Sequence, residues 1–169
     1  MLRRLRENGP VVLVPLAWTF AIAAHVDLLE TRTVLIAHLV MDAVLVAFTV
    51  ASWGDMREGV LLAWRRVLVA GLGVTLLGTA GLLQDPLHTG LLFVTVLGWL
   101  VIPAAGLAYT ATKVEVYPWA YGVGAGLSAA GAVGYAAGVS LAADPLMIAS
   151  LALAGAGQTK GIVAAVVAY

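Results

Sequence analysis

The sequence contains no cysteine, and only 11% of its 169 residues are charged. Without cysteine the chain can form neither disulfides nor thiolate metal sites, and it has no cysteine nucleophile. Equal numbers of acidic and basic residues give a formal net charge of zero, which removes the electrostatic basis for binding nucleic acid. Any metal site therefore has to be built from histidine, aspartate, glutamate or methionine.

Recognised catalytic motifs are missing as well. The sequence has no Gly-x-Ser-x-Gly elbow, no HExxH motif and no paired acidic motif of the kind used in phosphatidyl transfer. The letters GVGAGL lie inside an apolar run with no strand before them, so they indicate helix packing rather than a phosphate-binding loop. No catalytic residue is assigned, and whether the protein is an enzyme stays open.

Long apolar runs dominate what is present. Hydrophobic residues make up 62% of the chain and the mean hydropathy is +1.01, too apolar for one soluble core, so the lipid bilayer is the expected solvent. About 20 apolar residues span a membrane. Six segments reach that length: 9–29, 33–53, 60–83, 87–109, 118–142 and 145–169. We therefore predict an all-α fold, a six-helix transmembrane bundle in which residues 1–169 form one domain.

Short polar links separate these segments, so neighbours in the sequence should pack as antiparallel pairs. Pro118 and Pro145 fall at predicted helix starts, where proline is well tolerated. Pro15 and Pro103 fall inside predicted spans, and each is expected to kink its helix.

Most cations fall in links on one side of the predicted bundle, which sets the orientation. If the N-terminus is cytoplasmic, Arg32 is the only cation outside. The first segment also resembles a signal peptide, but its apolar run is too long and a second span follows at once. We predict a cell-membrane protein that retains its first helix and has both termini in the cytoplasm. The cations assigned to the inner side are Arg3, Arg4, Arg6, Arg57, Arg65, Arg66 and Lys113.

Small residues set the last two predicted spans apart. Gly122 lies four residues before Gly126, and Gly134 lies four before Gly138. Such spacing lets helix backbones approach closely. The simpler interpretation is packing within one bundle, and the alternative is contact with a second copy or within a larger membrane complex.

The three histidines are predicted to converge near the outer surface. His25 and His38 lie equally far from the link between the first two spans, roughly 10 Å below the turn at about 1.5 Å per residue, so they could meet. His88, at the start of the fourth predicted span, falls on the same side. Asp42 follows His38 by one helical turn, and Asp27 lies beside the first link.

Three functions fit this outer cluster. The histidines could ligate copper, zinc or a haem, as in an accessory protein of a respiratory or metal-handling system. Alternatively, His38 and Asp42 form a proton relay with Lys160 in a transporter or channel. The third possibility is a structural membrane subunit, in which the histidines only make hydrogen bonds. In every case Asp42 must be neutral, paired or facing water, because an ionised acid deep in a span is costly.

Lys160 lies in the middle of the last predicted span. On the predicted topology Asp42 lies about 13 Å and Lys160 about 22 Å from the outer side, at about 1.5 Å per residue. A direct pair therefore needs the long lysine side chain or a bridging water chain, and the alternative is that Lys160 snorkels to the inner interface. Arginine and aspartate outnumber lysine and glutamate, a composition typical of GC-rich prokaryotes.

Overall fold

The computed structural model describes the backbone of residues 2–168 and the side chains of Gly9 and residues 11–168. Residues 2–168 contain no strand, which confirms the all-α prediction. Six helices follow one another: α1 Leu2–His25, α2 Thr31–Ser52, α3 Gly59–Leu82, α4 Thr89–Ala111, α5 Pro118–Ser140 and α6 Asp144–Ala168.

Five of these helices, α2 to α6, are long and apolar enough to cross a membrane. In α1 the apolar stretch is shorter, Val11–His25. The predicted first span, 9–29, is therefore too long at its C-terminal end. The helix stops at His25 because Asp27 takes a left-handed backbone conformation, with a φ of 56°, which an α-helix does not accommodate. The fold is nevertheless a multi-pass helical membrane bundle.

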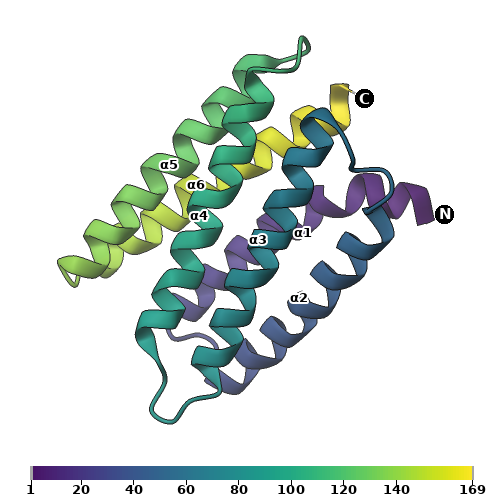
Figure 1. Cartoon of the computed structure of the whole chain (residues 1–169). Coiled ribbons are helices and arrows are strands. Elements are labelled where there is room, and N and C mark those ends of the chain that lie inside the picture. Colours follow the sequence, from purple (N-terminus) through teal and green to yellow (C-terminus); the bar gives the residue numbers. More distant parts are fainter. Residues whose placement is uncertain (1, 169) are drawn as a thin grey trace.

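Both chain ends lie at the same end of the bundle, together with the α2–α3 and α4–α5 links (Figure 1). The α1–α2, α3–α4 and α5–α6 links lie at the opposite end. Alternate links must lie at opposite ends, because each of the six helices runs from one end of the bundle to the other. Which side of the membrane each end faces stays a prediction.

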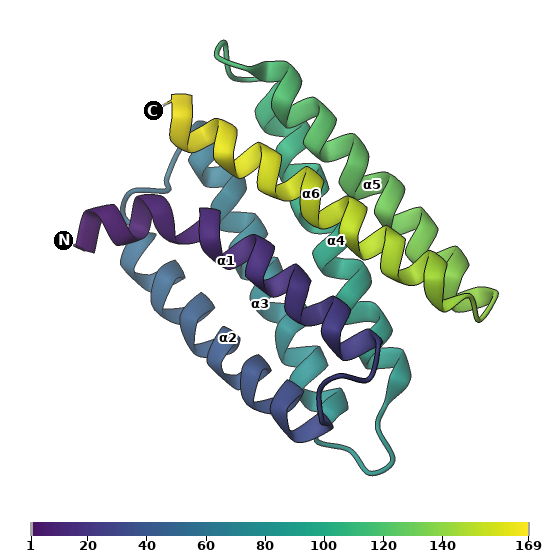
Figure 2. The ribbon, with the colours of Figure 1, turned by 180° about the vertical axis from the view of Figure 1, so that it is seen from behind.

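The order of packing differs from the order of the sequence at one point. Each of the helices from α2 to α6 packs against its sequence neighbour, as predicted. Helix α1 instead packs against α6, and α2 packs against α3 (Figure 2). The predicted antiparallel pair of α1 and α2 is therefore wrong, although only a short link joins the two helices.

The tightest helix pair is α5 and α6, because glycines let the two backbones touch. A Cβ atom added to Gly124 would lie 2.6 Å from the carbonyl oxygen of Gly157. At Gly131 it would lie 2.6 Å from the carbonyl oxygen of Ser150, and at Gly138 it would lie 2.6 Å from a side-chain carbon of Met147. A residue larger than glycine would require a backbone shift at Gly124 and Gly131, and a shift of the Met147 side chain at Gly138.

The four glycines singled out from the sequence divide between two faces of α5. Gly134 faces Ser150 of α6, and Gly138 lies buried beside the start of the same helix. Gly122 and Gly126 are exposed, and nothing lies within 4 Å of a Cβ built on Gly126. Since residues two apart on a helix differ by about 200° in direction, a contact made by Gly124 turns Gly122 and Gly126 away.

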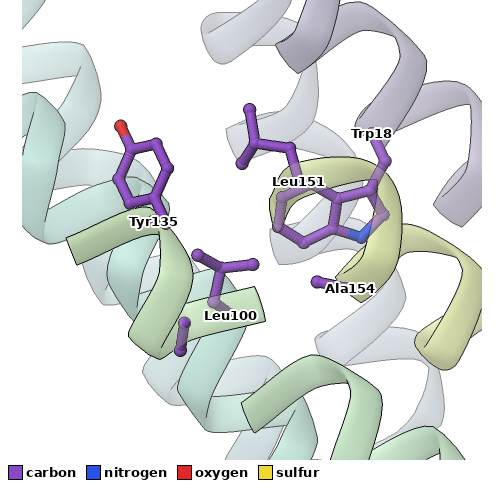
Figure 3. Close-up of a cluster of buried hydrophobic side chains, with 6 residues drawn as sticks. Trp18, Leu100, Tyr135, Leu151 and Ala154 are labelled. Carbon is purple, nitrogen blue, oxygen red and sulfur yellow. The ribbon is translucent and has the colours of Figure 1, made fainter. Parts of the chain in front are cut away.

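The largest core cluster joins four helices, α1, α4, α5 and α6 (Figure 3). Leu100 and Leu151 are completely buried at its centre. Trp18 of α1 lies against Gly155 of α6, where an added Cβ would come within 2.9 Å of the tryptophan side chain. Gly155 has no side chain, so the large Trp18 ring fits against α6 at this point, which explains why α1 packs there. The buried members of the cluster are Trp18, Leu100, Ala132, Tyr135, Leu151 and Ala154.

Candidate functional site

Asp42 lies buried between α2 and α3, with 9% of its surface exposed. The Thr79 hydroxyl donates a hydrogen bond of 2.7 Å to Oδ2. The other carboxyl oxygen, Oδ1, is buried and has no hydrogen-bond partner among the described residues. Buried polar atoms nearly always have partners, so an oxygen left over within an apolar span marks this position as unusual.

Two more buried oxygens on α2 lack partners within the described part of the chain, Thr49 Oγ1 and Ser52 Oγ. Several other hydroxyls in the bundle bond to the carbonyl four residues earlier, as Thr75 does to Gly71 and Thr110 does to Gly106. Thr49 and Ser52 do not make this bond.

Helical geometry places these hydroxyls on the same face as Asp42. Positions 38, 42, 49 and 52 are separated by three, four or seven residues, which is the spacing of one helix face. We call His38, Asp42, Thr49 and Ser52 the α2 polar row. At about 1.5 Å per residue the row extends over roughly 21 Å, and Leu45 is buried in the middle of it.

His38 begins the row and rests on α3. Its Nδ1 lies 3.0 Å from the Val34 carbonyl oxygen. A carbonyl only accepts, so Nδ1 carries the proton and Nε2 is left as an acceptor. The ring lies over Gly78, where a Cβ atom would come within 3.0 Å of the imidazole Cδ2. A glycine on α3 thus makes the room that the imidazole occupies.

His25 lies in a different part of the molecule. Its Nδ1 lies 2.8 Å from the Ala21 carbonyl oxygen, and its Nε2 lies 3.0 Å from the Tyr135 hydroxyl. The carbonyl accepts the Nδ1 proton, so the tyrosine hydroxyl donates to Nε2. Both ring nitrogens are therefore already bonded, and the histidine attaches the end of α1 to α5. His25 and His38, which the sequence allowed to meet, have partners on different helices.

His88 and Asp27 are exposed. His88 precedes the first residue of α4, and its Nδ1 accepts a hydrogen bond of 3.2 Å from the Leu91 backbone N–H. This is the geometry of a helix N-cap. Among the described residues no group of three or more histidine, aspartate or glutamate side chains is placed to hold a metal. The histidines of the predicted outer cluster thus lie in three separate environments.

Lys160 has an aromatic partner at the start of α5. Its ammonium nitrogen lies 4.5 Å from the centroid of the Trp119 ring, within the range of a cation–π interaction. Asp42 is instead bonded to Thr79 on α3. The two residues proposed as a relay thus have different partners, and the position of Lys160 suits the snorkelling alternative.

A buried network around Gln158 is the feature that sequence reasoning missed. Trp18 Nε1 donates to Gln158 Oε1 over 3.0 Å. The Gln158 amide nitrogen donates over 2.9 Å both to the Trp99 carbonyl oxygen and to Ser128 Oγ. These bonds join α1, α4, α5 and α6 through one side chain that is 4% exposed.

Pro103 explains why the Trp99 carbonyl needs this partner. Proline has no N–H, so the carbonyl four residues earlier in α4 loses its normal helical hydrogen bond. Gln158 supplies the missing donor from α6. The signal was present in the sequence, as a proline inside one span and a glutamine inside another, but their proximity was not.

The network also reaches α3, because the Trp99 indole donates to Thr75 Oγ1 over 2.9 Å. None of the described hydrogen bonds of this network involves α2. A fully bonded polar network makes a core rigid, whereas the α2 polar row is left partly unsatisfied. The unsatisfied row is therefore the candidate functional site.

Comparison of the chain with protein-family models, curated proteins and solved structures gives no match. What the α2 polar row does is therefore inferred from its own contacts.

Proposed function

We propose that the protein is a membrane transporter or channel that moves protons or a small cation along the boundary of α2 and α3. Asp42 is the binding group. The observation that supports this proposal is its carboxyl group, which is nine-tenths buried, accepts one hydrogen bond from Thr79 and has one oxygen without a described partner. Acids of this kind inside membrane spans are typical of proton and ion pathways.

The other members of the α2 polar row suit the same task. The hydroxyls of Thr49 and Ser52 can each donate and accept a hydrogen bond, so they can pass on a proton or coordinate a partly dehydrated cation. The free Nε2 of His38 is a proton acceptor at the other end of the row. Together these groups extend over roughly 21 Å of a hydrocarbon core about 30 Å thick.

The position of α2 in the bundle favours movement. Helix α2 packs against α3 and lies outside the buried network that joins the other helices. A transporter needs an element that shifts relative to a rigid remainder. Helix α2 meets that description better than α1, which Trp18 and His25 attach to the core through hydrogen bonds.

A metal- or haem-binding accessory gains less support. Both ring nitrogens of His25 are bonded, and the described residues offer no cluster of three ligands. A purely structural role is compatible with the Gln158 network, but it does not explain why a buried oxygen of Asp42 has no described partner.

The test is ion flux in liposomes that contain the purified protein and an internal pH-sensitive dye. With a potassium potential and valinomycin, wild-type protein is expected to acidify or alkalinise the lumen according to the sign of the potential. Asp42→Asn should lower this flux to the leak of empty liposomes, because the amide cannot release a proton or balance a cation.

The matched control is Asp85→Asn, which removes an equal charge from an exposed position in the α3–α4 link and should leave flux unchanged. Gel filtration and thermal unfolding check that each variant is folded. Equal flux in wild type and Asp42→Asn, or no wild-type flux of protons, sodium or potassium above empty liposomes, contradicts the proposal.

A further inference from the structure

A second site lies at the far end of the α2–α3 pair from His38. It is a hollow of about 340 Å³ lined by Trp53, Arg65, Arg66, Val69 and Ala70. Trp53 is the C-cap residue that directly follows α2, and the two arginines lie in the second turn of α3. The α2–α3 link, which begins next to Trp53, lies at the end of the bundle where both chain termini lie (Figure 1).

Arg65 is held in place by an aromatic ring. Its guanidinium carbon lies 4.4 Å from the centroid of the Trp53 ring, a stacking distance for a cation–π contact. Stacking uses the face of the guanidinium and leaves its N–H edge available for an anion. The side chain is partly buried, so less conformational freedom remains to be lost when a ligand binds.

Both arginines line the hollow, and none of the other residues that line it is acidic. Two guanidiniums that line one hollow favour a ligand with negative charge, and their planar N–H edges match phosphate oxygens.

The surroundings place this charge at the depth of lipid headgroups. Two further cation–π pairs lie at the same end of the bundle: Lys113 at 5.6 Å from the Tyr109 ring and Lys160 at 4.5 Å from the Trp119 ring. Tryptophan, tyrosine and snorkelling cations concentrate at the membrane interface. Deeper in the span, Val69 gives the hollow an apolar wall.

We infer that this hollow binds an anionic phospholipid. Arg65 and Arg66 hold the headgroup phosphate, and the hydrocarbon chain lies along Val69 and Ala70. Inorganic phosphate would satisfy the guanidiniums but would leave the apolar wall unused, which favours the lipid as the source of the phosphate. The site does not depend on the proposed transport function, because none of its residues belongs to the α2 polar row.

The test is native mass spectrometry of the detergent-purified chain with added phosphatidylglycerol, phosphatidylcholine or inorganic phosphate. Wild-type protein is expected to bind phosphatidylglycerol in preference to phosphatidylcholine. The double change Arg65→Gln with Arg66→Gln should weaken binding about thirtyfold, since each cation contributes roughly a fivefold attraction to an anionic lipid. Arg57→Gln, in the adjacent link but outside the hollow, should keep the wild-type affinity.

A single variant keeps the inference testable if the double variant does not fold. Arg66 is exposed, so Arg66→Gln should fold normally and weaken phosphatidylglycerol binding about fivefold. The inference is overturned if the single and double variants bind this lipid as wild type does, or if phosphatidylcholine binds equally well. It is also overturned if inorganic phosphate at the same concentration displaces the lipid, because that result identifies a site for the free anion.

Discussion

Replacing Gln158 by leucine tests whether the buried network holds the bundle together. The change removes three hydrogen bonds, those with Trp18, Ser128 and the Trp99 carbonyl oxygen. A side-chain hydrogen bond between membrane helices contributes about 0.6 kcal/mol on average and about 1.7 kcal/mol at most. We therefore expect the free energy of unfolding to fall by about 2–5 kcal/mol. The assay is denaturant unfolding in detergent micelles, followed by tryptophan fluorescence.

A control and a double-mutant cycle make this prediction specific. Ser140→Ala removes an exposed hydroxyl that bonds only within α5, and it should change stability by less than about 0.5 kcal/mol. Pro103→Ala restores a backbone N–H that can reach the Trp99 carbonyl, so Gln158→Leu should cost less in that background. The expected coupling is about 0.6–1.7 kcal/mol, the value of one such bond. A loss below 0.5 kcal/mol for Gln158→Leu, or additive costs in the cycle, would refute the reasoning.

Two further predictions concern helix contacts. Gly124→Ala should destabilise the protein by about 1–3 kcal/mol, because the new Cβ would meet the Gly157 carbonyl oxygen at 2.6 Å. Gly126→Ala, on the open face of α5, should be neutral or slightly stabilising. Equal melting temperatures for the two variants would contradict this prediction. Tyr135→Phe should cost about 1 kcal/mol by removing the hydroxyl that donates to His25, and nitrogen NMR of the imidazole should report a changed Nε2 environment. An unchanged imidazole spectrum would mean that this hydrogen bond does not form.

The same physical rule distinguishes the two polar regions of the bundle. A polar atom buried away from water stabilises a fold when it is bonded and costs free energy when it is not. Around Gln158 the bonds connect α1, α3, α4, α5 and α6. On α2 the oxygens of Asp42, Thr49 and Ser52 lack described partners. The proposed transport function gives this unfavourable arrangement a purpose.

The fold class and the positions of most helices follow from the sequence alone. Apolar runs of membrane length, short polar links and prolines at helix starts are local features, and a helix satisfies its backbone hydrogen bonds locally in lipid. For that reason α2 to α6 begin and end close to the predicted limits. The early end of α1 at His25 was missed because the left-handed conformation of Asp27 is not encoded by a proline or a glycine.

Which helices touch, and through which faces, becomes visible only in the packed bundle. Lipid is as apolar as the bundle interior, so a hydrophobic pattern does not identify the packed face of a membrane helix. The choice depends on particular long-range fits, such as the Trp18 ring against α6 and its bond to Gln158, 140 residues away in the chain. That fit draws α1 away from α2, gives His25 a tyrosine partner in place of His38, and leaves Asp42 bonded to Thr79 on α3.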